Sequence, residues 1–244
     1  PIMWKSRLRP ANRVIQAYMD DSGSLSFRTG KFFVGACVLI EETAHRDLEN
    51  LIVNNVVNRI VPAARRQAFV FRASSVFHQK DQFSRWGKNR CDELLGSLVG
   101  IIEDNEIPIV YGAVNKPKLR AKYVNPINPH VMAFVQCGES IERWMKENRP
   151  QRRWLPCVGR SDSDKKIEEM FDDCKTYGPP FGYWTVKWRF ICDVMSFTTP
   201  RQSRVFWLSD LSAFLINRHL HDKDTKGLYE KIAPHIFWGK LFPR

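Results

Sequence analysis

Two aspartates lie where a solvated surface carboxylate is not expected. Asp20 follows directly on the apolar run at residues 14–19, and Asp210 comes directly after the aromatic stretch at residues 205–207, where an apolar helix begins. Carboxylates held at a strand end and on a helix facing a sheet are typical of phosphoryl-transfer nucleases. Hard divalent cations prefer oxygen ligands and bind one or two carboxylates together with substrate phosphates. The pattern predicts a cation site.

Both aspartates also have simpler explanations. The sequence Asp20-Asp21-Ser22-Gly23 is typical of a turn between two strands. An aspartate at the start of a helix stabilises that helix by capping and by its interaction with the helix dipole, which would explain Asp210 without a metal. Residue type and position alone therefore leave a metal site and two structural roles open.

Positive charge suggests a partner. The chain has 38 Lys and Arg against 26 Asp and Glu, a formal net charge of +12, which favours a polyanion such as nucleic acid. Residues 59–90 contain eight basic residues and one acid, interleaved with aromatic residues. Cations neutralise phosphates and aromatic faces stack bases, so this stretch is a candidate nucleic-acid track. The alternative is a solvated face with aromatic residues in the core. The predicted nucleic-acid contacts are Arg65, Arg66, Arg72, Arg85, Lys88, Lys116, Lys118 and Arg160.

The elements that would position these residues alternate between strands and helices. Strands are expected at residues 14–19, 31–40, 68–71, 107–114 and 155–158, with extended segments at 184–192 and 204–207. Helices are expected at residues 43–61, 81–102, 131–147 and 162–177, and from about 209 onward. Residues 116–129, broken by three prolines, are expected to form a loop. We expect one α/β domain over residues 1–244.

The cysteines and the hydropathy indicate a compartment. The six cysteines contain no CxxC pair and most lie in apolar stretches, which favours buried thiols in a reducing environment over a zinc site or a disulfide framework. No run approaches 18 consecutive apolar residues. We expect a cytoplasmic protein with no membrane partner.

Two segments carry a family resemblance. The string AYMDDSG at residues 17–23, followed by FVGA at 33–36, resembles the opening DESG signature of the DUF3800 family of RNase H-like proteins. WLSDL at 207–211, followed by Phe214 and Arg218, is similar to that family's closing helix. The resemblance spans nearly the whole chain. It implies an RNase H-like fold, a mixed central β-sheet flanked by helices that brings the first-strand and last-helix aspartates together.

The same resemblance implies an activity. Family members are regarded as metal-dependent nucleases, which would hydrolyse phosphodiester bonds of DNA or RNA by a two-metal-ion mechanism. By position, Asp20 and Asp210 match the metal-binding catalytic aspartates, and Asp21 matches the acid that follows the first of them. The implied cofactor is Mg²⁺ or Mn²⁺.

The middle motifs depart from the family pattern. Arg72 stands where the family has a histidine, Asn115 replaces an acid, and no carboxylate precedes Arg160. Asp162 or Asp164 could supply a third metal ligand, although Asp162 is as well explained as a first-turn helix residue. The second hypothesis is therefore a non-catalytic subunit, binding nucleic acid or a protein partner, that keeps the fold with a degraded site.

Overall fold

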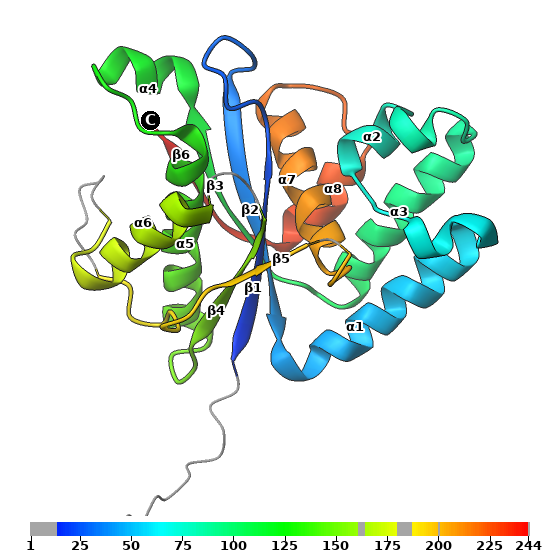
Figure 1. The fold of residues 1–244 in the computed structure, drawn as a ribbon, viewed down its shortest axis with the longest axis horizontal. Coiled ribbons are helices and arrows are strands. Elements are labelled where there is room, and N and C mark those ends of the chain that lie inside the picture. The colour runs from blue at the N-terminus through cyan, green and yellow to red at the C-terminus, as the bar shows by residue number, and fades with distance from the viewer. Residues whose placement is uncertain (1–13, 161–163, 180–186, 200, 244) are drawn as a thin grey trace, which may run out of the picture.

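The computed structural model describes residues 14–160, 164–179, 187–199 and 201–243. A mixed six-stranded sheet runs through the centre with helices on both faces, as the α/β prediction requires (Figure 1). Across the sheet the strands are β5 (Ser196–Thr198), β4 (Trp154–Gly159), β1 (Ile15–Ser22), β2 (Phe32–Glu41), β3 (Ile109–Asn115) and β6 (Ile236–Phe242).

The strand directions bring the end of β4 to the end of β1. Strands β1, β2 and β3 form an antiparallel meander, whereas β4 runs parallel to β1, β5 parallel to β4 and β6 parallel to β3. Met19 pairs with Val158, so the next residue of β1, Asp20, lies beside Gly159. The parallel pairing places the last residue of β4 at the first candidate aspartate.

Helices cover the two faces unequally. On one side lie α4 (Lys116–Lys122), α5 (Pro129–Asn148) and α6 (Asp164–Thr176) (Figure 1). On the other lie α1 (His45–Ile52), α2 (Ala73–Phe77), α3 (Lys88–Asp104), α7 (Phe206–Leu220) and α8 (Leu228–Ile232). Each face has its own apolar core, one built around α5 and the other around α3 and α7.

Alternation along β1 assigns its side chains to these two cores. Tyr18 packs in the core of the α7 face, while Ala17 and Met19 pack in the core of the α5 face. Because successive strand residues point to opposite faces, Asp20 points toward α7 and Asp21 toward α5. The adjacent aspartates therefore do not share one face of the sheet.

Gly112 in β3 lets α5 pack closely on the sheet. A Cβ at this position would lie 2.2 Å from the Ala133 carbonyl oxygen and 2.5 Å from the Cys137 nitrogen. We expect Gly112→Ala to lower the free energy of unfolding by about 2–3 kcal/mol or more in a urea titration, because the helix backbone must shift. Gly100→Ala in α3, whose added Cβ meets nothing within 4 Å, is the control. It should leave stability unchanged or higher, and an equal loss in both variants would contradict the packing.

Several predicted elements differ from the observed ones. The extended segment predicted at 204–207 is wrong, because residues 204–205 form a turn and helix α7 begins at Phe206. A short, fully buried apolar run has no periodicity that separates a strand from a helix. Residues 68–71 form no strand, and the predicted loop at 116–129 begins with α4. The predicted helix at 43–61 is α1 continued by a π-helical segment, Val53–Asn58. Strands β5 and β6 and helix α8 were not predicted.

Burial agrees with the expectation for the cysteines. All six are free thiols, and every one except Cys192 is buried. In the part of the chain that the structure describes, no helix combines the length and hydrophobicity that a membrane crossing requires.

Candidate functional site

Asp210 lies in the second turn of α7 and bonds to another helix. Its Oδ2 accepts a hydrogen bond of 2.9 Å from the backbone N–H of Ala73, the first residue of α2. The carboxylate thus satisfies a backbone donor at the start of α2, where a negative charge is also favoured by the helix dipole. Helix α7 begins four residues earlier, at Phe206, so the alternative explanation, in which Asp210 caps its own helix, is wrong.

Asp20 approaches Asp210 from the end of β1. Its Oδ1 accepts a hydrogen bond of 2.8 Å from the backbone N–H of Asp21, and the residue is only partly exposed. Burial, followed by the charges of Asp210 and Asp21, raises the pKa of Asp20 well above its usual range. Burial raises the pKa of Asp210 to about 7. Two aspartates 190 residues apart in sequence therefore lie close enough for their charges to repel.

Among the described residues, Arg72 is the arginine whose charge acts on all three carboxylates. Arg72, directly before α2, lowers the pKa values of Asp20, Asp21 and Asp210 by its charge, although burial has the larger, opposite effect on each. Arg72 is exposed and, within the described residues, forms no direct ion pair. Its charge offsets only part of the repulsion, so either a proton or a further cation would stabilise the site.

Asp21 is paired on the other face of the sheet. Its Oδ1 lies 3.4 Å from Nε2 of His130, a buried residue in the first turn of α5. Burial lowers the pKa of His130, whereas the charges of Asp21 and Asp164 raise it. Asp164 thus lies near His130 rather than completing the pair of Asp20 and Asp210. No sequence signal connected His130 to the site, because only tertiary packing places α5 beside β1.

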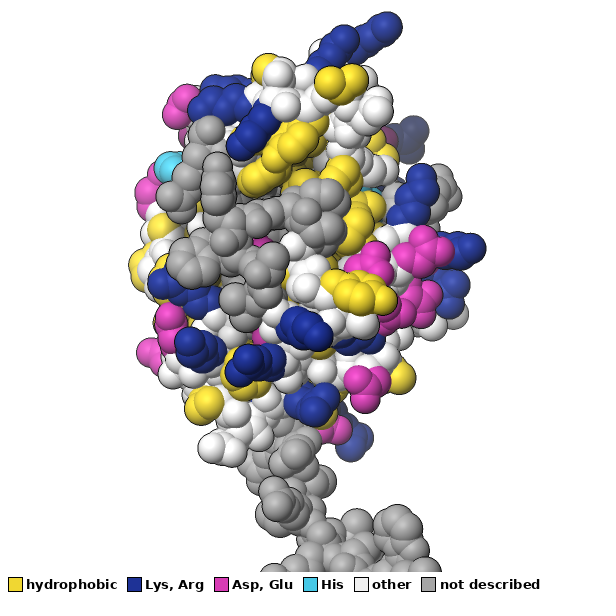
Figure 2. Space-filling view, turned by 90° about the vertical axis from the view of Figure 1, so that its left-hand side faces the viewer, with side chains coloured by type: hydrophobic (Ala, Val, Ile, Leu, Met, Phe, Trp, Pro, Cys, Tyr) yellow, Lys and Arg dark blue, Asp and Glu magenta, His cyan; other side chains and the backbone are white. Residues whose placement is uncertain are grey.

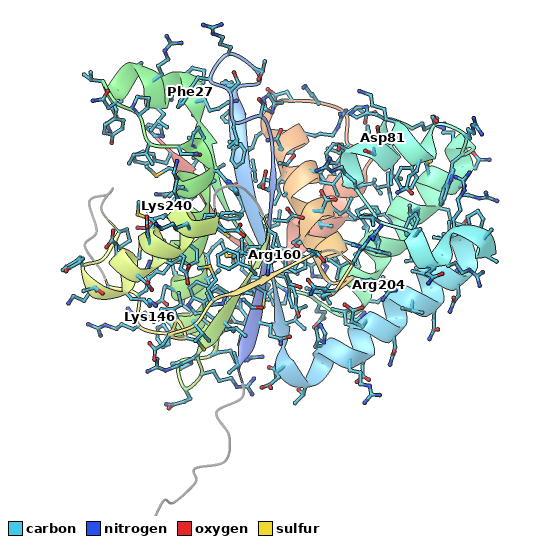
Figure 3. The ribbon with its side chains drawn as sticks, in the orientation of Figure 1. Phe27, Asp81, Lys146, Arg160, Arg204 and Lys240 are labelled. Carbon is cyan, nitrogen blue, oxygen red and sulfur yellow. The ribbon has the colours of Figure 1, made fainter. Side chains whose placement is uncertain are left out.

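The end of β4 supplies no carboxylate. A Cβ added at Gly159 would lie 3.9 Å from Oδ1 of Asp20, and the next residue, Arg160, is exposed near the centre of Figure 3. Asp162, predicted as a metal ligand, lies outside the described residues. Among those described, no group of three or more His, Cys, Asp and Glu side chains is arranged to hold a metal. A cation here would draw on two carboxylates, with water and substrate phosphate supplying other ligands, as Mg²⁺ commonly does.

The predicted nucleic-acid track is partly structural. Its aromatic residues Phe69, Phe71 and Trp86 are buried in the core, so they cannot stack bases. Arg66 donates to the carbonyl oxygens of Val61, at 3.1 Å, and Asn58. The exposed basic residues of this stretch are Arg59, Arg65, Arg72, Lys80, Arg85, Lys88 and Arg90, of which Arg59 is paired with Glu93. The alternative of core aromatics beneath a solvated face therefore accounts for the aromatic residues of this stretch.

Lys116 is not a surface cation. The residue is fully buried, and its Nζ donates hydrogen bonds to the carbonyl oxygens of Ser24 and Ser26, both at 2.7 Å, and of Thr29. These carbonyls belong to the β1–β2 loop that follows the aspartates. The predicted phosphate contact is wrong for Lys116, because its ammonium group already holds this loop, whereas Lys118 is exposed.

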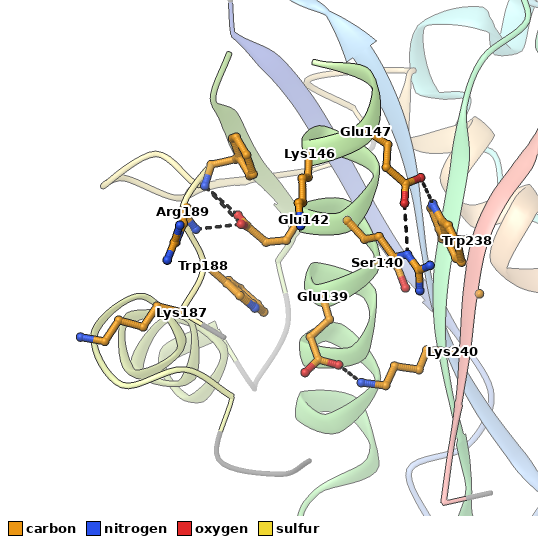
Figure 4. A pocket seen from close by; sticks show the side chains of 13 residues that line it. Glu139, Ser140, Glu142, Lys146, Glu147, Lys187, Trp188, Arg189, Trp238 and Lys240 are labelled. Carbon is orange, nitrogen blue, oxygen red and sulfur yellow. Dashed lines mark hydrogen bonds and ion pairs between the residues drawn. The ribbon is translucent and has the colours of Figure 1, made fainter. Parts of the chain in front are cut away.

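One cavity lies away from the aspartates. It has a volume of about 910 Å³ and is formed by α5, β6 and residues 187–190 (Figure 4). Its carboxylates are bound already: Glu139 by Lys240, Glu142 by the backbone N–H groups of Arg189 and Phe190, and Glu147 by Arg143. On this side of the molecule Lys and Arg are dispersed among acidic residues (Figure 2). The described residues that line the cavity therefore offer no free carboxylate for a metal.

The raised aspartate pKa values predict a pH-dependent stability. Asp210 has a pKa of about 7 in the fold against an ordinary 3.8, so folding favours its protonated form. That contribution is fully present below about pH 4 and is lost as the pH rises through 7. We expect the free energy of unfolding in EDTA to fall between pH 5 and pH 8 by more in the wild type than in Asp210→Asn. Parallel urea titrations at several pH values check this, and identical pH profiles would contradict it.

The chain matches no model of a known protein family, no curated protein and no solved structure.

Proposed function

We propose that this protein is a divalent-metal-dependent nuclease with an RNase H-like fold, acting on DNA or RNA. The observation that carries the proposal is the approach of two partly buried carboxylates, Asp20 and Asp210. Burial raises the pKa of both, the charge of Asp210 raises that of Asp20, and the charge of Asp21 raises both. Such an arrangement destabilises a folded protein unless a cation or a proton compensates it. A mixed sheet with one aspartate on its first strand and the other on a late helix supports the fold assignment.

Each residue has a role in this proposal. Asp20 and Asp210 hold Mg²⁺ or Mn²⁺, which when bound activates water and stabilises the leaving oxygen. The backbone N–H groups of Asp21 and Ala73 fix one oxygen of each carboxylate. Arg72, exposed and within electrostatic reach of both aspartates, binds and orients the substrate phosphate through its guanidinium group. Asp21 supports the site indirectly, through its contact with His130.

The test combines metal binding with cleavage. Mn²⁺ binding is measured by electron paramagnetic resonance, and cleavage is assayed on single-stranded DNA, duplex DNA, single-stranded RNA and an RNA–DNA hybrid with Mg²⁺, Mn²⁺ or EDTA. We expect Mn²⁺ binding and metal-dependent cleavage of at least one substrate. No cleavage of any substrate in either metal would overturn the proposal.

A second candidate is a non-catalytic nucleic-acid-binding or partner-binding subunit. This candidate is favoured by Gly159, the β4 residue beside Asp20, because a glycine has no side chain that could act as a metal ligand. Binding of nucleic acid with no cleavage and no Mn²⁺ binding would support this candidate over the nuclease.

A further inference from the structure

Basic side chains gather where α2 ends against the last turns of α7. The guanidinium carbon of Arg218 lies 4.2 Å from the centre of the Phe77 ring, and Nζ of Lys226 lies 4.4 Å from it. Arg218 also places Nη1 3.4 Å from Nε2 of His78. These residues come from three separate segments, so only the fold brings them together. We call His78, Lys80, Arg218, Lys223 and Lys226 the α2–α7 basic cluster.

The cluster carries uncompensated positive charge. Burial is the largest cause that lowers the pKa of His78. The charges of four cations lower it further: Arg218, Lys80, Lys226 and Lys223. Among the described residues, Asp92 is the one carboxylate that forms an ion pair with a cation of the cluster, to Lys226 at 2.7 Å, while Asp224 acts electrostatically on Arg218. Asp81 and Asp222 adjoin Lys80 and Lys223 in the chain but form no ion pair with them in the described part of the structure. Lys80 and Lys223 are exposed and, within the described part of the chain, have no ion pair.

Helix α2 connects this cluster to the aspartate pair. Its first residue, Ala73, donates to Asp210, and its last, Phe77, packs against Phe214 and Arg218. Along α7, Arg218 lies eight residues after Asp210, about 12 Å at 1.5 Å per residue. A nucleic-acid strand covers that distance in a few nucleotides. A strand with one phosphate at the aspartates could therefore reach the cluster with another.

We propose that the α2–α7 basic cluster is a second phosphate subsite, which binds the sugar-phosphate backbone a few nucleotides from the phosphate held at Asp20 and Asp210. This inference rests on the proposed function for the position of the first phosphate. The planar guanidinium of Arg218, held against Phe77 and bonded through Nε to the Asp224 carbonyl oxygen, presents its remaining N–H groups to phosphate oxygens. Lys80 and Lys223 add charge without a competing ion pair.

The test measures binding in EDTA, so that cleavage does not interfere. Fluorescence anisotropy compares the wild type with Lys80→Gln/Lys223→Gln, which alters two side chains with no structural partner, on labelled 12-nucleotide and 2-nucleotide DNA. On the single-stranded 12-mer the salt slope of log K should fall by about 0.7 per lost contact. The phosphate of the dinucleotide can occupy the cluster on its own, so the double variant should bind the dinucleotide more weakly than the wild type does. The matched control is Lys165→Gln/Lys166→Gln, two exposed lysines of α6 across the sheet, which should bind the 12-mer as the wild type does.

A second readout follows His78 directly. Bound phosphate near His78 should raise the pKa of this residue in an NMR titration of its ring protons with the 12-mer, and the Lys80→Gln/Lys223→Gln variant should show a smaller change. Unchanged salt slopes, an equal loss in the α6 control, or a His78 response to inorganic phosphate but not to the 12-mer would each overturn the subsite. If the double variant loses affinity while the wild type cleaves nothing, the subsite stands and the nuclease proposal fails. If the wild type cleaves nucleic acid but the double variant binds the 12-mer as tightly as the wild type does, the nuclease proposal stands and the subsite fails.

Discussion

Replacing Asp210 with asparagine is expected to abolish metal-dependent cleavage and raise stability without metal. Cleavage should fall by more than about 100-fold, the upper range for outer-shell partners of a metal site, because Asp210 is proposed as a direct ligand. The asparagine Oδ1 can still accept the Ala73 hydrogen bond, so α2 keeps its place. Above pH 7 one of two repelling charges is gone, so the melting temperature in EDTA should increase. Initial cleavage rates and thermal melts with and without Mn²⁺ measure both effects.

The neighbouring aspartate is the matched control. Asp21→Asn changes the same functional group one residue from Asp20, but on the face of the sheet where His130 lies. We expect Asp20→Asn to behave like Asp210→Asn, and Asp21→Asn to retain Mn²⁺ binding with a smaller loss of activity. If Asp21→Asn alone removed activity and metal binding while Asp210→Asn left both intact, the assignment of the metal to the α7 face would be wrong.

Replacing Lys116 with methionine is expected to destabilise the fold. The substitution leaves three carbonyl oxygens of the β1–β2 loop without the ammonium group that now binds them. Hydrogen bonds to a charged group contribute about 1.5–3 kcal/mol each, so a loss of at least about 3 kcal/mol in the free energy of unfolding is expected. Urea titration measures this loss. Hydrogen exchange should also show faster opening of residues 24–29.

Lys118→Met separates this role from a loss of surface charge. Lys118 is exposed two residues further along the chain, and its replacement should change stability by no more than about 0.5 kcal/mol. If Lys116→Met were as stable as the wild type but bound nucleic acid more weakly, the buried role of Lys116 would be refuted and a phosphate contact reinstated.

Local pattern was sufficient for much of the scaffold. The apolar runs at 14–19, 31–40 and 107–114 correctly predicted β1, β2 and β3, and helical spacing correctly predicted α5. These segments are long or strongly periodic, so near neighbours in sequence determine their conformation. Side chains alternate between the two faces along a strand, so Asp20 and Asp21 point to opposite faces of the sheet. The sequence did not show which core each of them would face.

The apolar runs and helical periodicity were sufficient to predict an α/β fold with Asp20 near the end of its first strand. The contacts of the charged side chains could be known only from the folded chain: Asp210 with Ala73 and Asp20, Lys116 with the β1–β2 loop, and Arg218 with Phe77 and His78. The local sequence around a lysine at the end of a strand does not show whether its side chain is buried or exposed. Its environment depends on contacts about 90 residues away. Such contacts depend on strand order and helix packing, which no local period encodes.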